Sequence, residues 1–80
     1  MEIIIYSSNT CQYCVAIKDF FKSHGLSFTE KNISENPEFR KELIKKHIMG
    51  IPYTLIDDES ILGFDIEKIK EILQNKGVEI

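Results

Sequence analysis

The 80-residue sequence has little of several features that mark common classes of protein. It has no stripe of basic residues, and its net charge of −3 comes from interleaved signs, which argues against a nucleic-acid partner. No apolar run approaches the roughly 18–20 residues that a membrane-spanning helix needs. Residues 1–6 include no basic region, so we expect a strand there and no secretory signal peptide. We therefore expect a cytoplasmic protein, which we take to be a monomer, without nucleic-acid or membrane partners.

Cysteine is also scarce, because the chain has only Cys11 and Cys14. In a reducing compartment, a cysteine pair this close is more often catalytic or metal-binding than a structural disulfide. A structural zinc site needs four ligands, and the other candidates, His24 and His47, are 23 residues apart and fall on different predicted helices. We therefore expect no metal. Two inert buried cysteines remain an alternative.

No linker, repeat or low-complexity segment divides the chain, which predicts a single domain over residues 1–80. Strands are expected at 3–7, at 28–33 near an edge, at 52–56 and at 61–63, with a polar turn over 57–60. Apolar residues at helical spacing predict helices over 12–24, from 37 onward and from 66 to about 76. Their expected caps are Gly25 at the first C-terminus, Asn36 and Asp65 at the next two N-termini, and Gly77 at the end.

The predicted order of elements is βαβαββα, which is an α/β fold. The first two strands should run parallel through a right-handed crossover helix, because this handedness is almost universal for such units. The last two strands should form an antiparallel hairpin. A chain of this length has room for one small sheet covered by helices.

The cysteines fall where the first predicted strand meets the first helix. Free peptide N–H groups and the positive end of the helix dipole favour a thiolate there. In such positions the pKa of a thiol drops from about 8.5 to about 3.5–7.5. Cys11, at the helix end, is therefore the expected nucleophile, and Cys14, one turn further on, is expected to resolve the mixed disulfide. Lys18 is a candidate cationic neighbour, but a solvated lysine is the simpler interpretation.

Three segments together resemble the glutaredoxin family. Residues 5–14, IYSSNTCQYC, are similar to its active-site segment, in which Thr-Cys-Pro-Tyr-Cys opens a helix. Ile51-Pro52 falls where that family has a cis-proline, and residues 61–65, ILGFD, resemble its Gly-Gly-(Cys/Phe)-Asp segment. The resemblance runs over essentially the whole chain in consistent order.

This resemblance implies a thioredoxin fold, with a four-stranded mixed sheet in the order 2-1-3-4 and helices on both faces. It also implies a thiol–disulfide oxidoreductase with glutathione as cosubstrate and disulfide-containing proteins as substrates. Tyr13 would form a wall of the glutathione groove, and the backbone of Ile51 would pair with the peptide like an added strand. The full implied set of glutathione-binding residues is Cys11, Tyr13, Ile51, Pro52, Gly63, Phe64 and Asp65.

Ordinary structural roles remain open for several of these residues. Tyr13 and Phe64 could be packing residues, Pro52 could be a trans proline at a strand start, and Asp65 could be a simple N-cap. The last of these roles is compatible with glutathione binding, because a helix N-terminus also suits a carboxylate.

The sequence departs from the glutaredoxin pattern at four positions. Gln12 replaces the proline between the cysteines, Ser8 stands where many members have a lysine, Gly50 replaces a Thr or Ser, and Ile66 replaces a polar residue. Arg40, Lys41 and Lys45 are the candidates to replace the missing lysine.

These departures leave other functions open. One is a glutathione-independent redoxin that is reduced by a flavoprotein reductase and donates electrons to ribonucleotide reductase or a peroxidase. A lower-ranked one is a glutaredoxin that binds a [2Fe–2S] cluster. A non-enzymatic adaptor that uses only the fold is a third.

Overall fold

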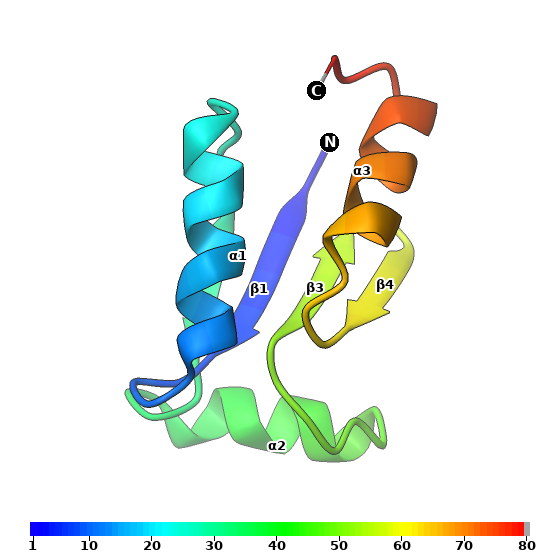
Figure 1. Ribbon diagram of the computed structural model, residues 1–80. Helices are drawn as coiled ribbons and strands as arrows, with labels where there is room; N and C mark the ends of the chain where they lie inside the picture. The colour runs from blue at the N-terminus through cyan, green and yellow to red at the C-terminus, as the bar shows by residue number, and fades with distance from the viewer. Residues whose placement is uncertain (80) are drawn as a thin grey trace.

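The computed structural model describes residues 1–79 as a four-stranded sheet and three helices (Figure 1). The elements in chain order are β1 (Ile3–Ser7), α1 (Gln12–Ser23), β2 (Thr29–Asn32), α2 (Pro37–Lys45), β3 (Tyr53–Ile56), β4 (Glu59–Leu62) and α3 (Ile66–Asn75). The predicted βαβαββα order is confirmed. Among these residues, no helix combines the length and apolar character needed to cross a membrane.

The strands lie in the order β2-β1-β3-β4, as the thioredoxin fold requires. β1 pairs with β2 in parallel and with β3 in antiparallel orientation, and β3 and β4 form an antiparallel hairpin. β2 is an edge strand, as its weak apolar pattern predicted, and the central strand β1 is the continuous apolar run. The start of α1 and the segment that leads into β3 therefore meet at one end of the sheet (Figure 1).

Helices cover both faces of the sheet. α1 and α3 lie on one face, where the apolar core includes Ile5, Phe21 and Leu73, each with no exposed surface. α2 covers the other face through a smaller cluster that contains Tyr6 and Leu43.

Local signals explain where the helices begin and end. Asn36 Oδ1 accepts a hydrogen bond from Glu38 N–H at 3.0 Å and so caps α2. Gly25 and Gly77 follow α1 and α3 with φ of 69° and 88°, the left-handed conformation expected of a helix-ending glycine. α2 ends in the same geometry but places His47 there, with φ of 60°. This turn directs residues 48–51 back across the C-terminal end of α2.

The turn between β3 and β4 is shorter than predicted. It contains only Asp57 and Asp58, because Ile56 already pairs with Glu59 and Leu55 with Ser60. The prediction of a turn over 57–60 was wrong for its last two residues. β4 is an edge strand with one face open to solvent, so polar side chains are compatible with it.

A polar network holds α2 against the sheet. Glu42 Oε1 on α2 accepts hydrogen bonds from Tyr6 Oη at 2.7 Å and from Lys31 Nζ at 2.8 Å, which joins α2 to β1 and β2. The hydrogen bonds from Lys31 and Tyr6 hold the pKa of Glu42 below its usual range. The ionised carboxylate therefore stabilises the folded protein.

Replacement of Glu42 by Gln should lower the melting temperature at pH 7 by about 4–8 °C, which corresponds to about 1 kcal/mol in a domain of this size. Since the folded pKa lies below the unfolded value of about 4.3, this stabilisation is present above pH 4.3 and is lost as the pH falls through the folded pKa. Thermal unfolding by circular dichroism should therefore show a smaller difference from wild type at pH 3.

Glu38→Gln is the matched control, because Glu38 pairs with Lys41 on the same helix but both side chains are about two-thirds exposed. We expect it to change the free energy of unfolding by less than about 0.5 kcal/mol. A deficit of Glu42→Gln that stayed constant from pH 7 to pH 3 would contradict a role for the carboxylate charge.

Candidate active site

Cys11 and Cys14 lie at the junction of the β1–α1 loop and α1, and they are joined by a disulfide bond. Cys11 is the N-cap residue of α1 and is half-buried, whereas Cys14, within the first turn, has no exposed surface. The predicted positions of the two cysteines are confirmed. Solvent and a large substrate therefore reach Cys11 but not Cys14, so the interpretation of two buried, inert cysteines does not fit.

The start of α1 supplies hydrogen-bond donors to the first sulfur. Cys14 N–H donates to Cys11 Sγ at 3.1 Å, and Val15 N–H donates to the Cys11 carbonyl at 3.3 Å as the first bond of the helix. The first turn contains no acidic residue. A thiolate formed on Cys11 by reduction would therefore meet an N–H group and the positive helix end without a nearby carboxylate on that turn.

Lys18, one turn beyond Cys14, is not the solvated lysine that the sequence suggested. Its Nζ lies 2.8 Å from Glu30 Oε2, and its side chain is only 18% exposed. The same carboxylate accepts a hydrogen bond from the buried Ser7 hydroxyl at 2.6 Å. Hydrogen bonds from Lys18 and Ser7 keep the pKa of Glu30 below its usual range, so the ionised carboxylate pairs with the Lys18 ammonium.

Tyr13 and Phe64 form an aromatic pair beside the disulfide. Their rings stack with centroids 5.4 Å apart and planes 28° apart, although the residues are 51 positions apart in sequence. Tyr13 is 63% exposed and Phe64 is 47% exposed, so neither residue is part of the core. The pair brings together the Cys-x-x-Cys loop and the segment that precedes α3.

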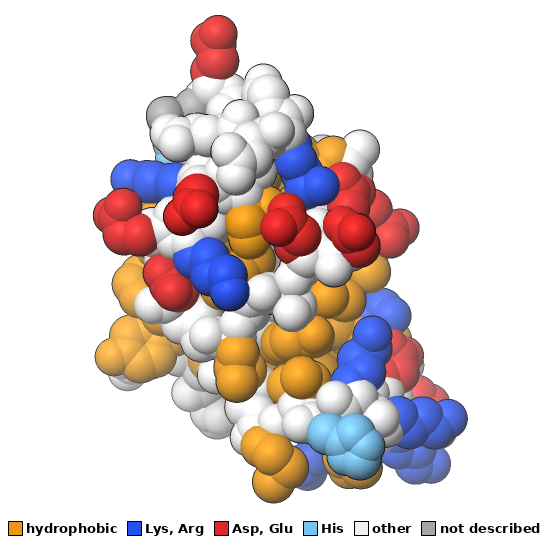
Figure 2. Space-filling view, turned by 90° about the vertical axis from the view of Figure 1, so that its right-hand side faces the viewer, with side chains coloured by type: hydrophobic (Ala, Val, Ile, Leu, Met, Phe, Trp, Pro, Cys, Tyr) orange, Lys and Arg blue, Asp and Glu red, His pale blue; other side chains and the backbone are white. Residues whose placement is uncertain are grey.

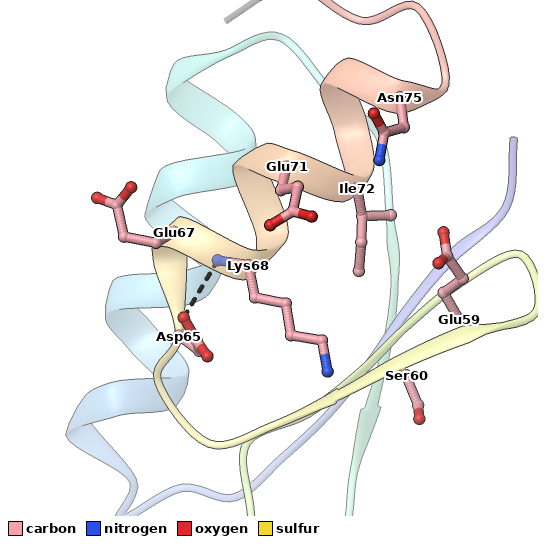
Figure 3. A pocket seen from close by; sticks show the side chains of 8 residues that line it. All are labelled: Glu59, Ser60, Asp65, Glu67, Lys68, Glu71, Ile72 and Asn75. Carbon is pink, nitrogen blue, oxygen red and sulfur yellow. Dashed lines mark hydrogen bonds between the residues drawn. The ribbon is translucent and has the colours of Figure 1, made fainter.

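The segment before α3 is fixed by two backbone contacts. Gly63 has φ of 85°, a conformation that favours glycine, and its N–H donates to the Pro52 carbonyl at 2.8 Å. Asp65 is the N-cap of α3, because its Oδ1 accepts from Lys68 N–H at 3.1 Å (Figure 3). Among residues 1–79, no hydrogen bond or ion pair engages the second carboxylate oxygen of Asp65.

The peptide bond between Ile51 and Pro52 is cis, as the resemblance implied. Pro52 is buried, and Ile51 is half-buried. Ile51 also lines a cleft of about 280 Å³ against the C-terminal half of α2, and Arg40 lines the same cleft. The structure thus places Arg40 in the same cleft as Ile51, a residue of the predicted glutathione site.

The described residues contain no group of three or more His, Cys, Asp and Glu side chains arranged to hold a metal ion. His24 is the C-cap of α1, at the opposite end of that helix from the cysteines, and its ring packs on Phe20. His47 lies at the end of α2. The two histidines do not join the cysteines in one site.

A cysteine pair at the start of a helix on this four-stranded sheet defines a dithiol protein of the thioredoxin fold. Residues 3–61 match the sequence model of the glutaredoxin family. The chain is 34% identical over 62 residues to the glutaredoxin-like protein NrdH of Lactococcus lactis subsp. cremoris, covering 78% of this chain and 86% of that protein. It is 39% identical over 65 residues to glutaredoxin 3 of Escherichia coli, covering 80% and 78%.

Similarity to solved structures agrees with these matches. The structure of the glutaredoxin-like protein NrdH-redoxin from Escherichia coli superimposes with a TM-score of 0.82 and 29% identity, covering 90% of this chain and 95% of that one. The chain belongs to the glutaredoxin family. It is a glutaredoxin-type thiol–disulfide oxidoreductase with Cys11 and Cys14 as its redox-active pair.

Proposed function

We propose that this protein is a glutathione-linked oxidoreductase that reduces protein disulfides and glutathione mixed disulfides. The Cys11 thiolate attacks a substrate disulfide, a bond forms between Cys11 and one substrate sulfur, and the other substrate sulfur leaves and takes a proton. Cys14 then loses its proton and attacks Cys11, which releases the second substrate thiol and forms the Cys11–Cys14 disulfide. Two electrons have passed from the protein to the substrate.

Glutathione regenerates the dithiol in the proposed cycle. One glutathione thiolate attacks Cys11 and displaces Cys14, and a second attacks the glutathionyl sulfur, which yields glutathione disulfide and the reduced protein. The unequal burial of the cysteines supports this order, because an incoming thiolate reaches only Cys11. We place the reaction in the cytoplasm, where thiols are kept reduced, and propose that the protein acts there as a monomer.

The predicted glutathione groove has two walls in this proposal. Ile51 offers backbone groups to the cysteinyl part, next to Pro52, and Tyr13 covers the bound sulfur. Gly63, Phe64 and Asp65 would receive the γ-glutamyl end, with α3 N–H groups for its carboxylate and the free Asp65 oxygen for its amino group.

The position of Arg40 is the observation that most supports glutathione as the reductant. Ser8 cannot provide the cation that a lysine at this position would direct at the glycyl carboxylate. Arg40 lines the cleft that Ile51 shares, and no ion pair within 4 Å engages it among residues 1–79. Arginine suits this task because its guanidinium binds a carboxylate through two hydrogen bonds.

The test is to incubate the oxidised protein with millimolar reduced glutathione and to follow the appearance of protein thiols. We expect reduction by glutathione, and a rate about tenfold lower in Arg40→Gln, since one charge-assisted carboxylate contact contributes about 1.4 kcal/mol. Lys41→Gln on the same helix serves as the control. An oxidised protein that stays oxidised in glutathione would sink the proposal.

A second candidate is a glutathione-independent redoxin that a flavoprotein reductase reduces and that donates electrons to ribonucleotide reductase or a peroxidase. The similarity to NrdH proteins favours it, since the Escherichia coli NrdH-redoxin is described as having a thioredoxin-like activity profile. Ile66, where a polar contact to glutathione would be expected, packs against the core instead. Reduction by NADPH and thioredoxin reductase, without reduction by glutathione, would select this candidate.

A further inference from the structure

The hydroxyl group of Thr54 is buried without a partner. Thr54 lies on β3 and has no exposed surface. Among residues 1–79, its Oγ1 is the one buried side-chain nitrogen or oxygen atom that makes no hydrogen bond. Such a group costs stability, because it has given up its hydrogen bonds to water and gained none in the protein. Valine has nearly the same shape and would avoid this cost.

The register of the sheet shows which way the Thr54 side chain points. Thr54 pairs with Ile5 on β1 and with Ile61 on β4. Residues that lie directly opposite each other on neighbouring strands point to the same face of a sheet. Ile5 and Ile61 both belong to the apolar core that α1 and α3 cover. The Thr54 hydroxyl therefore lies on the side of the sheet that α1 covers, and not on the side of α2.

Cys14 enters the same layer from the helix. Cys14 and Ile17 are both buried and lie one turn apart on α1, so they face the sheet together. Ile17 packs in one core cluster with Ile5, the neighbour of Thr54 in the sheet. The first turn of α1 and the start of β3 also lie at the same end of the sheet (Figure 1). The fold thus places the Cys14 sulfur and the Thr54 hydroxyl in one buried layer.

No buried charge competes for either group. Figure 2 shows the charged side chains at the surface on the side that carries β4 and α3, and among residues 1–79 the buried polar side chains are only Ser7 and Thr54. Ser7, two residues after Ile5, points to the same face, but its hydroxyl donates to Glu30 Oε2 at 2.6 Å. Thr54 is thus the buried hydroxyl of this layer that is free to bind another group.

We propose that the Thr54 hydroxyl becomes the hydrogen-bond partner of the Cys14 sulfur when the Cys11–Cys14 disulfide is reduced. In the disulfide, Cys14 Sγ is bonded to Cys11, has no proton to donate and is a weak acceptor. Reduction leaves a thiol or a thiolate on Cys14, and a hydroxyl can accept from the first and donate to the second. This inference rests on the resolving role proposed for Cys14 and is independent of the reductant.

The hydrogen bond would also assist the resolving step. Cys14 must lose its proton before its sulfur attacks Cys11, and burial in an apolar layer disfavours the charged thiolate. A hydroxyl that donates to the thiolate offsets this effect, because hydrogen bonds to charged groups are the stronger ones. The substrate thiolate that leaves Cys11 takes up a proton, and Thr54 keeps its own. Thr54 would therefore favour the dithiol at equilibrium and speed the attack of Cys14.

The first experiment measures the reduction potential of Thr54→Val by equilibration with dithiothreitol. We expect an equilibrium constant for reduction about fivefold below that of wild type, which corresponds to a potential about 20 mV more negative. Thr54→Ser keeps the hydroxyl and should keep the wild-type potential. Valine removes an unpartnered hydroxyl, so the oxidised variant should remain folded. An unchanged potential in Thr54→Val would overturn the proposal, since the hydroxyl would then have the same surroundings in both redox forms.

Ser7→Ala is the matched control, because it removes the other buried hydroxyl on this face of the sheet. Its partner Glu30 is present in both redox forms, so the potential should stay at the wild-type value. An equal shift in Ser7→Ala and Thr54→Val would contradict a specific bond between Thr54 and Cys14.

The second experiment follows the reaction of the reduced protein with an aromatic disulfide that releases one coloured thiolate at each step. The first release reports the attack of Cys11 and the second the attack of Cys14. Thr54→Val should slow the second release about tenfold and leave the first unchanged. Equal slowing of both releases would mean that Thr54 does not act on Cys14.

Neither experiment contains glutathione, so a protein that glutathione cannot reduce would still give both results. A wild-type protein that releases only the first thiolate would refute the resolving role of Cys14. A wild-type second release that Thr54→Val leaves unchanged would refute the inference about Thr54 alone.

Discussion

Cys11→Ser should lose disulfide reductase activity, with a decrease in rate of at least about 1,000-fold, because no second nucleophile can reach a substrate. Cys14 has no exposed surface, so its sulfur cannot attack a disulfide in another molecule. The serine hydroxyl is not ionised at pH 7, and the N–H group of Cys14 that donates to Cys11 Sγ cannot change that. The measurement is single-turnover thiol consumption with 2-hydroxyethyl disulfide.

Cys14→Ser should behave differently, since Cys11 can still attack but nothing resolves the product. Mass spectrometry after reaction with glutathione disulfide should show one glutathionyl group on Cys14→Ser and none on Cys11→Ser. Similar activity in the two single variants would show that the roles of the cysteines are not distinct. A mixed disulfide on Cys14 in the Cys11→Ser protein would reverse the assignment.

Much of the fold could be predicted because its boundaries are set by local chemistry. Asn36 and Asp65 cap the helices that follow them, and Gly25 and Gly77 adopt the positive φ that ends a helix. β1 spans the predicted residues 3–7, since a strand buried on both faces has a continuous apolar run. Because β1 ends at Ser7 and α1 begins at Gln12, these boundaries place Cys11 and Cys14 at the start of the helix.

The parts of the site that the sequence did not reveal depend on long-range geometry. Lys18 meets Glu30 only because α1 lies over β2, and no local pattern sets that approach. Tyr13 stacks on Phe64 because the loop before α3 folds back toward the cysteines. Arg40 and Ile51 line one cleft because the chain turns back after α2 at His47. His47 adopts the positive φ typical of glycine, which its residue type does not predict.

Phe21→Ala should lower the free energy of unfolding by about 3–5 kcal/mol, the usual cost of a large cavity in a well-packed core. Phe21 has no exposed surface and joins α1 to the sheet in the same core cluster as Ile5 and Ile17. A chain of 80 residues has a total stability of only about 4–12 kcal/mol. We therefore expect much of the variant to be unfolded at 37 °C, as urea denaturation should show.

The function depends on this packing because α1 presents the cysteine pair. Phe20→Ala removes the same type of side chain at the preceding position, but Phe20 is only partly buried, so the loss of unfolding free energy should be clearly below about 3 kcal/mol. Reductase activity should fall in Phe21→Ala in proportion to the unfolded fraction, whereas Phe20→Ala should retain it at 25 °C. Equal destabilisation by the two substitutions would mean that Phe21 does not anchor α1 to the sheet.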